Sequence, residues 1–336
     1  MKQNTLLLRP RERSSVVCAL ARSRAEAQGP MFRLFVFTIS LFATTAAWGQ
    51  TTYNPKIAYA QASGSTQYLY LANADGTGAV RVATVGRDAN GFPGNIHGLD
   101  FAPGGGRIAY SDAGGIRVLT YTASNLGIKV DRNDPLVSGP NVTSPDFSPD
   151  GSRILYRDAF SGAVRVIAAS GGVPVSSYTA PCGWARWLRP VSFGNAFACY
   201  KSTGLQEPDG SWIYEIWAVY LDANYRFVST ALVLTTAEES FKQILEFDTA
   251  RSRDALLMVV NYVTGPRMVE VDIISGAVSV IPQGFGERVH YSSDDSCIVY
   301  RERVKGGSFI NSLNPVTGVS QRLTGKGSYG TTDAQP

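Results

Sequence analysis

Side chains that carry most enzyme chemistry are scarce in this sequence. The 336 residues include two histidines, His97 and His290, so a metal site built from several histidines is excluded by number. No Gly-x-Ser-x-Gly segment indicates a serine nucleophile, and no Cys-x-x-Cys pair indicates a thiol redox site. The sequence therefore predicts no catalytic residues, no metal and no cofactor, and it favours a binding protein over an enzyme.

Tryptophans are the one chemically distinctive group that clusters. Every tryptophan after residue 50 lies between positions 184 and 217. Aromatic rings on loops can stack on sugars or anchor a partner protein, although an aromatic core within one structural unit would give the same cluster. We predict a ligand- or partner-binding group from these aromatics and the first histidine, with Trp212 exposed: Trp212, Tyr214, Trp217, Trp184, Trp187 and His97.

Short strands recur along the chain and must position these groups. Five segments share an apolar residue followed two or three positions later by tyrosine, which is typical of a strand core, at residues 57–59, 108–110, 154–156, 197–200 and 298–300. A sixth, residues 256–260, is apolar without the tyrosine. The segments are about 40–60 residues apart, the length of one four-stranded unit in repeat proteins.

A turn motif precedes these strand cores. Its best copy is Pro145-Asp-Phe-Ser-Pro-Asp-Gly151, and residues 99–105 are the next best. Proline presets the first turn angle, aspartate accepts hydrogen bonds from the backbone that follows, and glycine accepts a positive φ. The motif therefore predicts a hairpin between two strands, in which Asp146 and Asp150 have structural roles.

Together these elements make six units, at about residues 50–90, 91–138, 139–180, 181–238, 239–283 and 284–336. Four-stranded units that stack around an axis bury a continuous core, so the sequence predicts an all-β fold, a six-bladed β-propeller of four-stranded antiparallel blades. The first unit lacks its turn motif, and the C-terminal tail resembles the entry to a further innermost strand. We predict that the tail joins the first blade and closes the ring.

Residues 147–156, Phe-Ser-Pro-Asp-Gly-Ser-Arg-Ile-Leu-Tyr, resemble the repeats of the TolB-like propeller family, a WD40-like repeat with a Pro-Asp-x-Ser-Pro-Asp-Gly core that Pro145 and Asp146 complete. The resemblance covers about residues 55–336 and is strongest in the third unit. The family includes a periplasmic protein of the Tol–Pal envelope system, so the resemblance implies an exported propeller. That protein has an α/β domain before its propeller, for which residues 50–55 leave no room.

The first 49 residues differ from the rest of the chain. They hold seven basic and two acidic residues against 31 and 27 in the whole chain, so the net charge of +4 comes from this segment. Residues 31–49 combine a basic start, about ten apolar residues and small residues, which is typical of a signal peptide and too short to span a bilayer. Residues 1–30 are interpreted as a disordered upstream extension, or alternatively as a long signal-peptide start. We expect a periplasmic or secreted protein.

Export permits disulfide bonds. Cys182 and Cys199 lie on opposite sides of a predicted hairpin, and we predict that they are paired. Cys297 then remains in an apolar strand, where a buried thiol is the usual state.

Three functions remain open. The first, which we favour, is a non-enzymatic scaffold of the cell envelope that binds an envelope or extracellular protein. The second is a carbohydrate-active enzyme or glycan-binding propeller, which would use the aromatics of blade four and a pair of carboxylates about 5–9.5 Å apart at the mouth of the channel, drawn from Asp88, Asp100, Asp146 and Glu246. The third is a structural module without a ligand. No basic stripe indicates nucleic-acid binding, and no membrane span is expected after the signal is removed.

Overall fold

The computed structural model describes residues 57–334, apart from residues 65, 86–95, 97, 181, 190, 240, 263, 283–285 and 293–294. The chain divides into two compact units, Met1–Trp48 and Gly49–Pro336, and every described residue belongs to the second. The predicted upstream extension and signal peptide therefore lie outside the described residues. Among those that are described, no helix has the length and apolar character that crossing a membrane requires.

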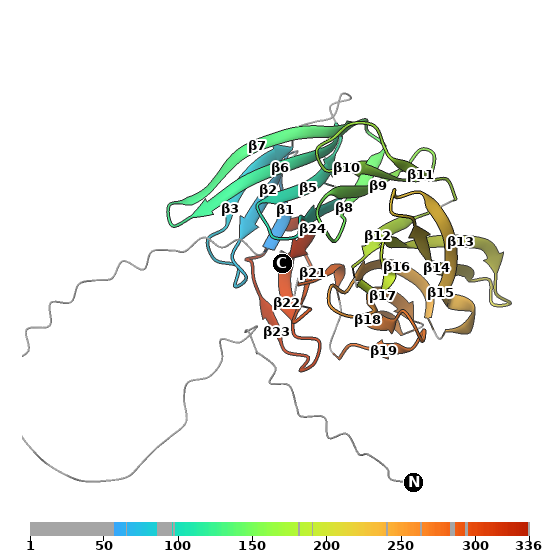
Figure 1. The fold of residues 1–336 in the computed structure, drawn as a ribbon. Coiled ribbons are helices and arrows are strands. Elements are labelled where there is room, and N and C mark those ends of the chain that lie inside the picture. The colour runs from blue at the N-terminus through green and yellow to red at the C-terminus, as the bar shows by residue number, and fades with distance from the viewer. Residues whose placement is uncertain are drawn as a thin grey trace, which may run out of the picture. The chain divides into compact units, whose positions relative to one another are not determined.

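The described residues form six four-stranded antiparallel sheets, the blades of a six-bladed β-propeller, which confirms the predicted fold class (Figure 1). Blades one to three consist of β24 (Ser328–Ala334), β1 (Ile57–Ser63), β2 (Thr66–Ala72) and β3 (Val80–Val85); of β4 (Gly98–Phe101), β5 (Arg107–Asp112), β6 (Gly115–Ser124) and β7 (Gly127–Ser138); and of β8 (Val142–Phe147), β9 (Arg153–Asp158), β10 (Val164–Ala168) and β11 (Ser176–Tyr178).

The remaining three blades follow the same order. They consist of β12 (Trp184–Leu188), β13 (Ala196–Gln206), β14 (Trp212–Leu221) and β15 (Phe227–Thr235); of β16 (Phe241–Thr249), β17 (Ala255–Tyr262), β18 (Gly265–Asp272) and β19 (Val278–Val280); and of β20 (Glu287–Tyr291), β21 (Ile298–Val304), β22 (Gly307–Leu313) and β23 (Ser320–Arg322). Strands β24, β4, β8, β12, β16 and β20 contact one another in a closed sequence, so these six inner strands surround the axis.

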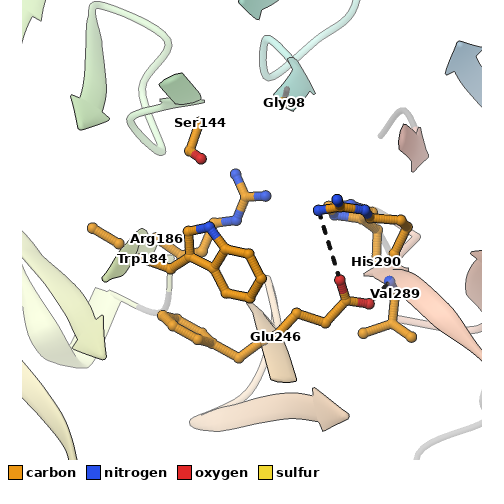
Figure 2. A pocket seen from close by; sticks show the side chains of 10 residues that line it. Gly98, Ser144, Trp184, Arg186, Glu246, Val289 and His290 are labelled. Atoms are coloured by element: carbon orange, nitrogen blue, oxygen red, sulfur yellow. Dashed lines mark hydrogen bonds and ion pairs between the residues drawn. The ribbon is translucent and has the colours of Figure 1, made fainter. Parts of the chain in front are cut away.

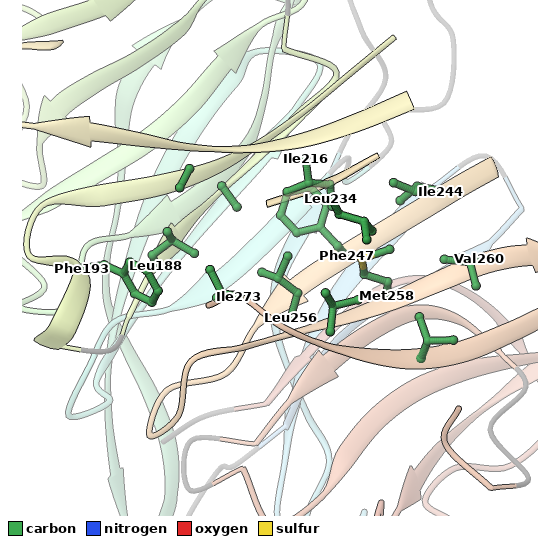
Figure 3. Packing of buried hydrophobic residues seen from close by; sticks show 14 of the residues in the cluster. Leu188, Phe193, Ile216, Leu234, Ile244, Phe247, Leu256, Met258, Val260 and Ile273 are labelled. Carbon is green, nitrogen blue, oxygen red and sulfur yellow. The ribbon is translucent and has the colours of Figure 1, made fainter. Parts of the chain in front are cut away.

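Apolar side chains fill the space between neighbouring blades. Residues 255–260 of β17 are all buried, because blades four and six cover the two faces of blade five. Successive side chains of a strand point to opposite faces, so alternate residues enter different cores. The side chains packed towards blade four are Leu256, Met258 and Val260 (Figure 3). Those packed towards blade six are Ala255, Leu257 and Val259.

The turn after Phe147 has the predicted form. Gly151 lies at φ 68° and its N–H donates to the carbonyl of Ser148 at 2.8 Å. The Asp150 carboxylate accepts the hydroxyl of Ser148 at 2.5 Å and the N–H of Ser152 at 3.0 Å. Asp150 therefore holds the hairpin between β8 and β9, which is the structural role that the motif indicates.

The C-terminal tail closes the ring. β24 pairs antiparallel with β1, with Ile57 opposite Ala334 and Tyr59 opposite Thr332. It thus supplies the inner strand of a blade whose other three strands come from the beginning of the propeller (Figure 1). The prediction that the tail completes the first blade is confirmed.

A disulfide bond lies within blade four. Cys182, just before β12, is bonded to Cys199 in β13, with their Cα atoms 5.6 Å apart. Both cysteines are buried in the core between blades three and four. Cys297 is half-buried immediately before β21.

Candidate functional site

One register position of the inner strands is charged or ionisable in blade after blade. It is the position that pairs with the second residue of the apolar strand core in the neighbouring strand. It is occupied in blades two to six, in that order, by Asp100, Asp146, Arg186, Asp248 and His290. We call these five residues the inner ring. Asp333 holds the same register position in β24.

Each of the three aspartates of the inner ring joins its own blade to the following one. The N–H of Phe147 donates to Asp100 at 2.6 Å, that of Trp187 to Asp146 at 2.5 Å and that of Tyr291 to Asp248 at 2.9 Å, and Oδ2 is the acceptor in each case. All three carboxylates are buried. Because a buried backbone N–H without an acceptor is costly, these carboxylates are committed to the joints between blades.

Arg189 joins two of these carboxylates. Its Nη2 lies 3.1 Å from Asp100 Oδ1 and 2.8 Å from Asp146 Oδ1. Two further guanidinium groups lie at longer range, with Arg186 3.9 Å from Asp146 and Arg251 4.0 Å from Asp100. Burial, followed by the charge of Asp100, raises the pKa of Asp146 to about 6, although Arg189 and Arg186 oppose this shift.

The third aspartate of the inner ring, Asp248, pairs with a histidine. Nδ1 of His290 lies 3.7 Å from Oδ2 of Asp248, and both side chains are buried. Burial alone would raise the pKa of Asp248, but the hydrogen bond and charge of His290, together with Arg189 and Arg186, lower it well below its usual value. Asp248 is thus held as a carboxylate at the axis.

A pocket of about 420 Å³, part of it open to solvent, lies directly beside the inner ring. Its lining contains the residues two positions before each ring residue, and we call them the mouth ring: Gly98, Ser144, Trp184, Glu246 and Arg288. Arg186, His290 and three apolar neighbours complete the lining. Figure 2 shows Trp184, Arg186 and Glu246 extending into this space from blades four and five.

Irregular backbone shapes the mouth ring. Ser144 and Arg288 have φ values of 55° and 56°, in the left-handed region that residues other than glycine seldom adopt. Both lie at register shifts of their inner strands, between Thr143 and Asp146 and between Glu287 and His290. Bulges of this kind redirect side chains and are common beside functional sites, where backbone strain also concentrates.

Gly98 completes the mouth ring through its lack of a side chain. A Cβ atom at this position would lie 2.8 Å from the Cα of Ser144. The bulged backbone of β8 therefore passes too close to β4 for any other residue, and this side of the pocket is lined by backbone.

Most of the ionisable side chains in the pocket lining are basic. Glu246 accepts the N–H of Val289 at 2.9 Å and lies 4.0 Å from the guanidinium of Arg288. Burial raises the pKa of Glu246, although Arg288 and His290 oppose the shift. With Arg186 and His290 also in the lining, the pocket combines two guanidinium groups, an imidazole and an indole with one carboxylate. This is a surface for recognising an acidic or polar group beside an apolar one.

The predicted aromatic group is not one cluster. Trp184 lines the pocket, whereas Tyr214 stacks on Tyr200 with ring centres 5.4 Å apart. Trp212, at the start of β14, is 48% exposed, as predicted. It does not belong to the pocket lining. Trp217 is half-buried, and its indole N–H donates to Glu215 at 2.7 Å.

The prediction that Trp187 belongs to a binding group is wrong. It is 1% exposed and lies in the core between blades three and four, so it cannot present a binding surface. Its indole N–H donates to the backbone carbonyl of Asp146 at 3.1 Å. The alternation of β12 explains the difference from Trp184, which lies three residues earlier and therefore points to the other side of the strand.

The predicted carboxylates do not form an open pair. Asp100 and Asp146 are buried and hydrogen-bonded as above, and only Glu246 lines the pocket. Asp88 and His97 lie outside the described residues. Within the part of the chain that the structure describes, no three His, Cys, Asp or Glu side chains are grouped so that they could hold a metal ion.

Sequence reasoning missed the arginines that shape this centre, namely Arg186, Arg189 and Arg288. A signal was present in the segments of blades four and six that correspond to the turn motif. Trp184-Ala-Arg-Trp and Arg288-Val-His-Tyr align with the segment that contains Asp146, and each replaces the aspartate by a basic residue. A charged or ionisable residue at the same position of each repeat thus indicates, from the sequence, that charged side chains surround the axis.

Comparisons with known proteins agree with the fold. No protein-family model matches the chain, and a search of curated proteins finds no relative. TolB from Acinetobacter baumannii matches with a TM-score of 0.59 at 14% identity, over 85% of this chain and 68% of that one. Putative TolB from Agrobacterium tumefaciens matches with a TM-score of 0.53 at 11% identity, over 82% of this chain and 92% of that one. A chain of a nidogen/laminin complex matches with a TM-score of 0.55 at 11% identity, over 84% of this chain and 98% of that one. At these identities the likeness shows one thing, that the chain has the β-propeller fold of TolB-like structures.

Proposed function

We propose that this chain is an exported, non-enzymatic propeller of the cell envelope that binds a partner protein at the pocket on its axis. The TolB-like repeat at residues 145–156 and the likeness in fold to two TolB structures support an envelope protein. The predicted signal peptide at residues 31–49 supports export. The pocket supplies the place where binding would occur.

The observation that carries the proposal is the way the axial carboxylates are used. Asp100, Asp146 and Asp248 each accept a backbone N–H from the next blade. Most families of glycosidases use two carboxylates that face the substrate, and in the described lining Glu246 is the one carboxylate present. Arginine and tryptophan side chains, by contrast, are the groups that dominate the energetics of protein interfaces.

The basic lining also favours a kind of partner. Arg288 has a side chain 38% exposed, and it lines the same pocket as Trp184. A partner segment with an acidic side chain next to an apolar one would pair with the guanidinium and cover the ring.

The experiment is a comparison of purified variants as baits in an envelope extract. We expect a protein captured by the wild type to be lost with Trp184→Ala and with Arg288→Gln. Trp212→Ala and Arg132→Gln are the matched controls, since both side chains are exposed away from the pocket. Equal capture by all four variants would contradict binding at the axis.

A glycan array on the same variants separates the second candidate. Binding of a defined glycan that is lost with Trp184→Ala but not with Trp212→Ala would replace the protein partner by a carbohydrate. The axial pocket would remain the site, and the protein-binding function would be wrong.

A further inference from the structure

The outermost strand of blade four is exposed along most of its length. In β15, residues 227–232 are all exposed, including Phe227 at 51%, Val228 at 60% and Leu232 at 48%. Contacts with the neighbouring blades are found near its two ends. The ring of Phe227 contacts Tyr178 of blade three, and the turn at Gly276 of blade five approaches the carbonyl of Val233.

Composition distinguishes β15 from the other outermost strands in the described part of the chain. Strands β11, β19 and β23 have three residues each, which is too short to offer much edge. β7 carries several charges and Pro135, and β3 carries Arg81. Short length, charge and proline are the features that normally protect a sheet edge from pairing with another chain. β15 has nine residues, Phe-Val-Ser-Thr-Ala-Leu-Val-Leu-Thr, with neither charge nor proline.

We propose that β15 is a self-association edge, at which two copies of this chain pair antiparallel about a twofold axis near Ala231. Antiparallel pairing about this residue places Thr230 opposite Leu232 and Ser229 opposite Val233. No charged side chain then meets another along the strand, and exposed apolar side chains of both copies become covered.

The charges that flank the strand select the occupant and its direction. Arg226 precedes β15 and is exposed, whereas Glu239 follows it. A second copy in antiparallel orientation places Arg226 of one chain at the end of the joint where Glu239 of the other lies. A parallel copy would place arginine beside arginine, which is unfavourable.

The extent of the regular edge sets the strength of the contact. The register of β15 with β14 shifts around Val228 and around Val233, so the regular ladder between the shifts is Ser229–Leu232. Bulges weaken further pairing at those points. Such a contact is smaller than about 1,200 Å², the lower limit for stable interfaces, so we expect a micromolar dimer. Each chain has one edge of this kind in its described part, so association closes at two copies.

The test is sedimentation equilibrium of the purified, exported protein from about 1 to 200 µM. We expect a reversible monomer–dimer equilibrium. Val228→Lys combined with Thr230→Lys should raise the dissociation constant at least tenfold, because the charges added at position 230 of the two copies lie diagonally across the joint and repel each other. The control adds the same charge at two exposed apolar positions on other blades, Leu126→Lys and Val316→Lys, and should leave the equilibrium unchanged.

A charge exchange tests the orientation independently of that variant. Arg226→Glu should weaken the dimer, and addition of Glu239→Arg should restore it, with thermal melting showing that each variant is folded. A protein that stays monomeric throughout the range, or a dimer that neither set of variants alters, would overturn the proposal. Partner capture at the axial pocket is measured separately, so either result leaves the proposed function to its own test.

Discussion

Asp146 and Trp187 join blades three and four by two hydrogen bonds. The backbone N–H of Trp187 donates to the carboxylate of Asp146 at 2.5 Å, and the indole N–H donates to the Asp146 carbonyl at 3.1 Å. Both residues are buried. The aspartate of the repeat motif therefore joins two blades, and Trp187, one of the predicted aromatic group, takes part in the same joint.

Two substitutions at Asp146 separate the effect of its hydrogen-bond acceptor from the effect of its negative charge on stability. Asp146→Ala removes the acceptor of the Trp187 N–H and should lower the free energy of unfolding by about 3 kcal/mol. Asp146→Asn keeps an acceptor oxygen, and the raised pKa of Asp146 shows that its surroundings disfavour the charge. We therefore expect the asparagine variant to cost about 1 kcal/mol or less. Urea unfolding at pH 7 measures both, and equal losses would contradict the role of the acceptor.

The pKa of Asp146 also predicts a pH dependence. Its value rises from the ordinary 3.8 to about 6 in the folded state. Between these values the folded state keeps a proton that the unfolded state has lost, so the contribution of Asp146 to stability is greatest below about pH 4 and falls as the pH rises to about 6. The unfolding free energy of the wild type, relative to Asp146→Asn, should decrease over this range. An increase would mean that the arginines dominate.

Removal of residues 325–336 should destabilise the whole propeller. The deletion takes away β24 and exposes the paired edge of β1. We expect the melting temperature to fall by more than about 5 °C in calorimetry. Deletion of residues 335–336 alone is the control, because it leaves β24 intact. An unchanged melting temperature for the long deletion would contradict ring closure by the tail.

The Cys182–Cys199 bond should stabilise blade four by limiting the unfolded chain. The cysteines are 17 residues apart, a loop for which cross-linking contributes about 3 kcal/mol. Serine at both positions should lower the unfolding free energy by about that amount, and a reducing agent should then have little further effect. Cys297→Ser is the control and should keep the full response to reduction. A wild type that reduction does not destabilise would show that the bond contributes nothing.

The blades could be predicted because their signals are local. The strand cores at residues 108–110 and 154–156 and the turn that ends at Gly151 each depend on neighbours within a few residues. Repetition at a blade-length spacing then indicates the propeller, since a blade cannot bury both of its faces alone. Closure by the tail follows from a first blade that lacks an inner strand.

The site was harder to predict because it is assembled between blades. Trp184 and Trp187 are three residues apart in one strand, yet one lines the pocket and the other is buried in the core. Which side of β12 faces the axis depends on how blade four packs against its neighbours. Arg189 meets Asp100 and Asp146 across three blades, a contact between residues up to 89 positions apart. No local pattern encodes such a distance.

By itself, the sequence determined the number of blades, their turns and the residues available at the axis, because strand alternation and turn chemistry act over short stretches of chain. Only the tertiary structure decided how those residues are used. It places the aspartates of the inner ring as acceptors for the next blade and brings Trp184, Glu246 and Arg288 together in one pocket. It also leaves β15 uncovered at the rim. Each of these outcomes depends on the packing of neighbouring blades, which closes the ring only when all six are present.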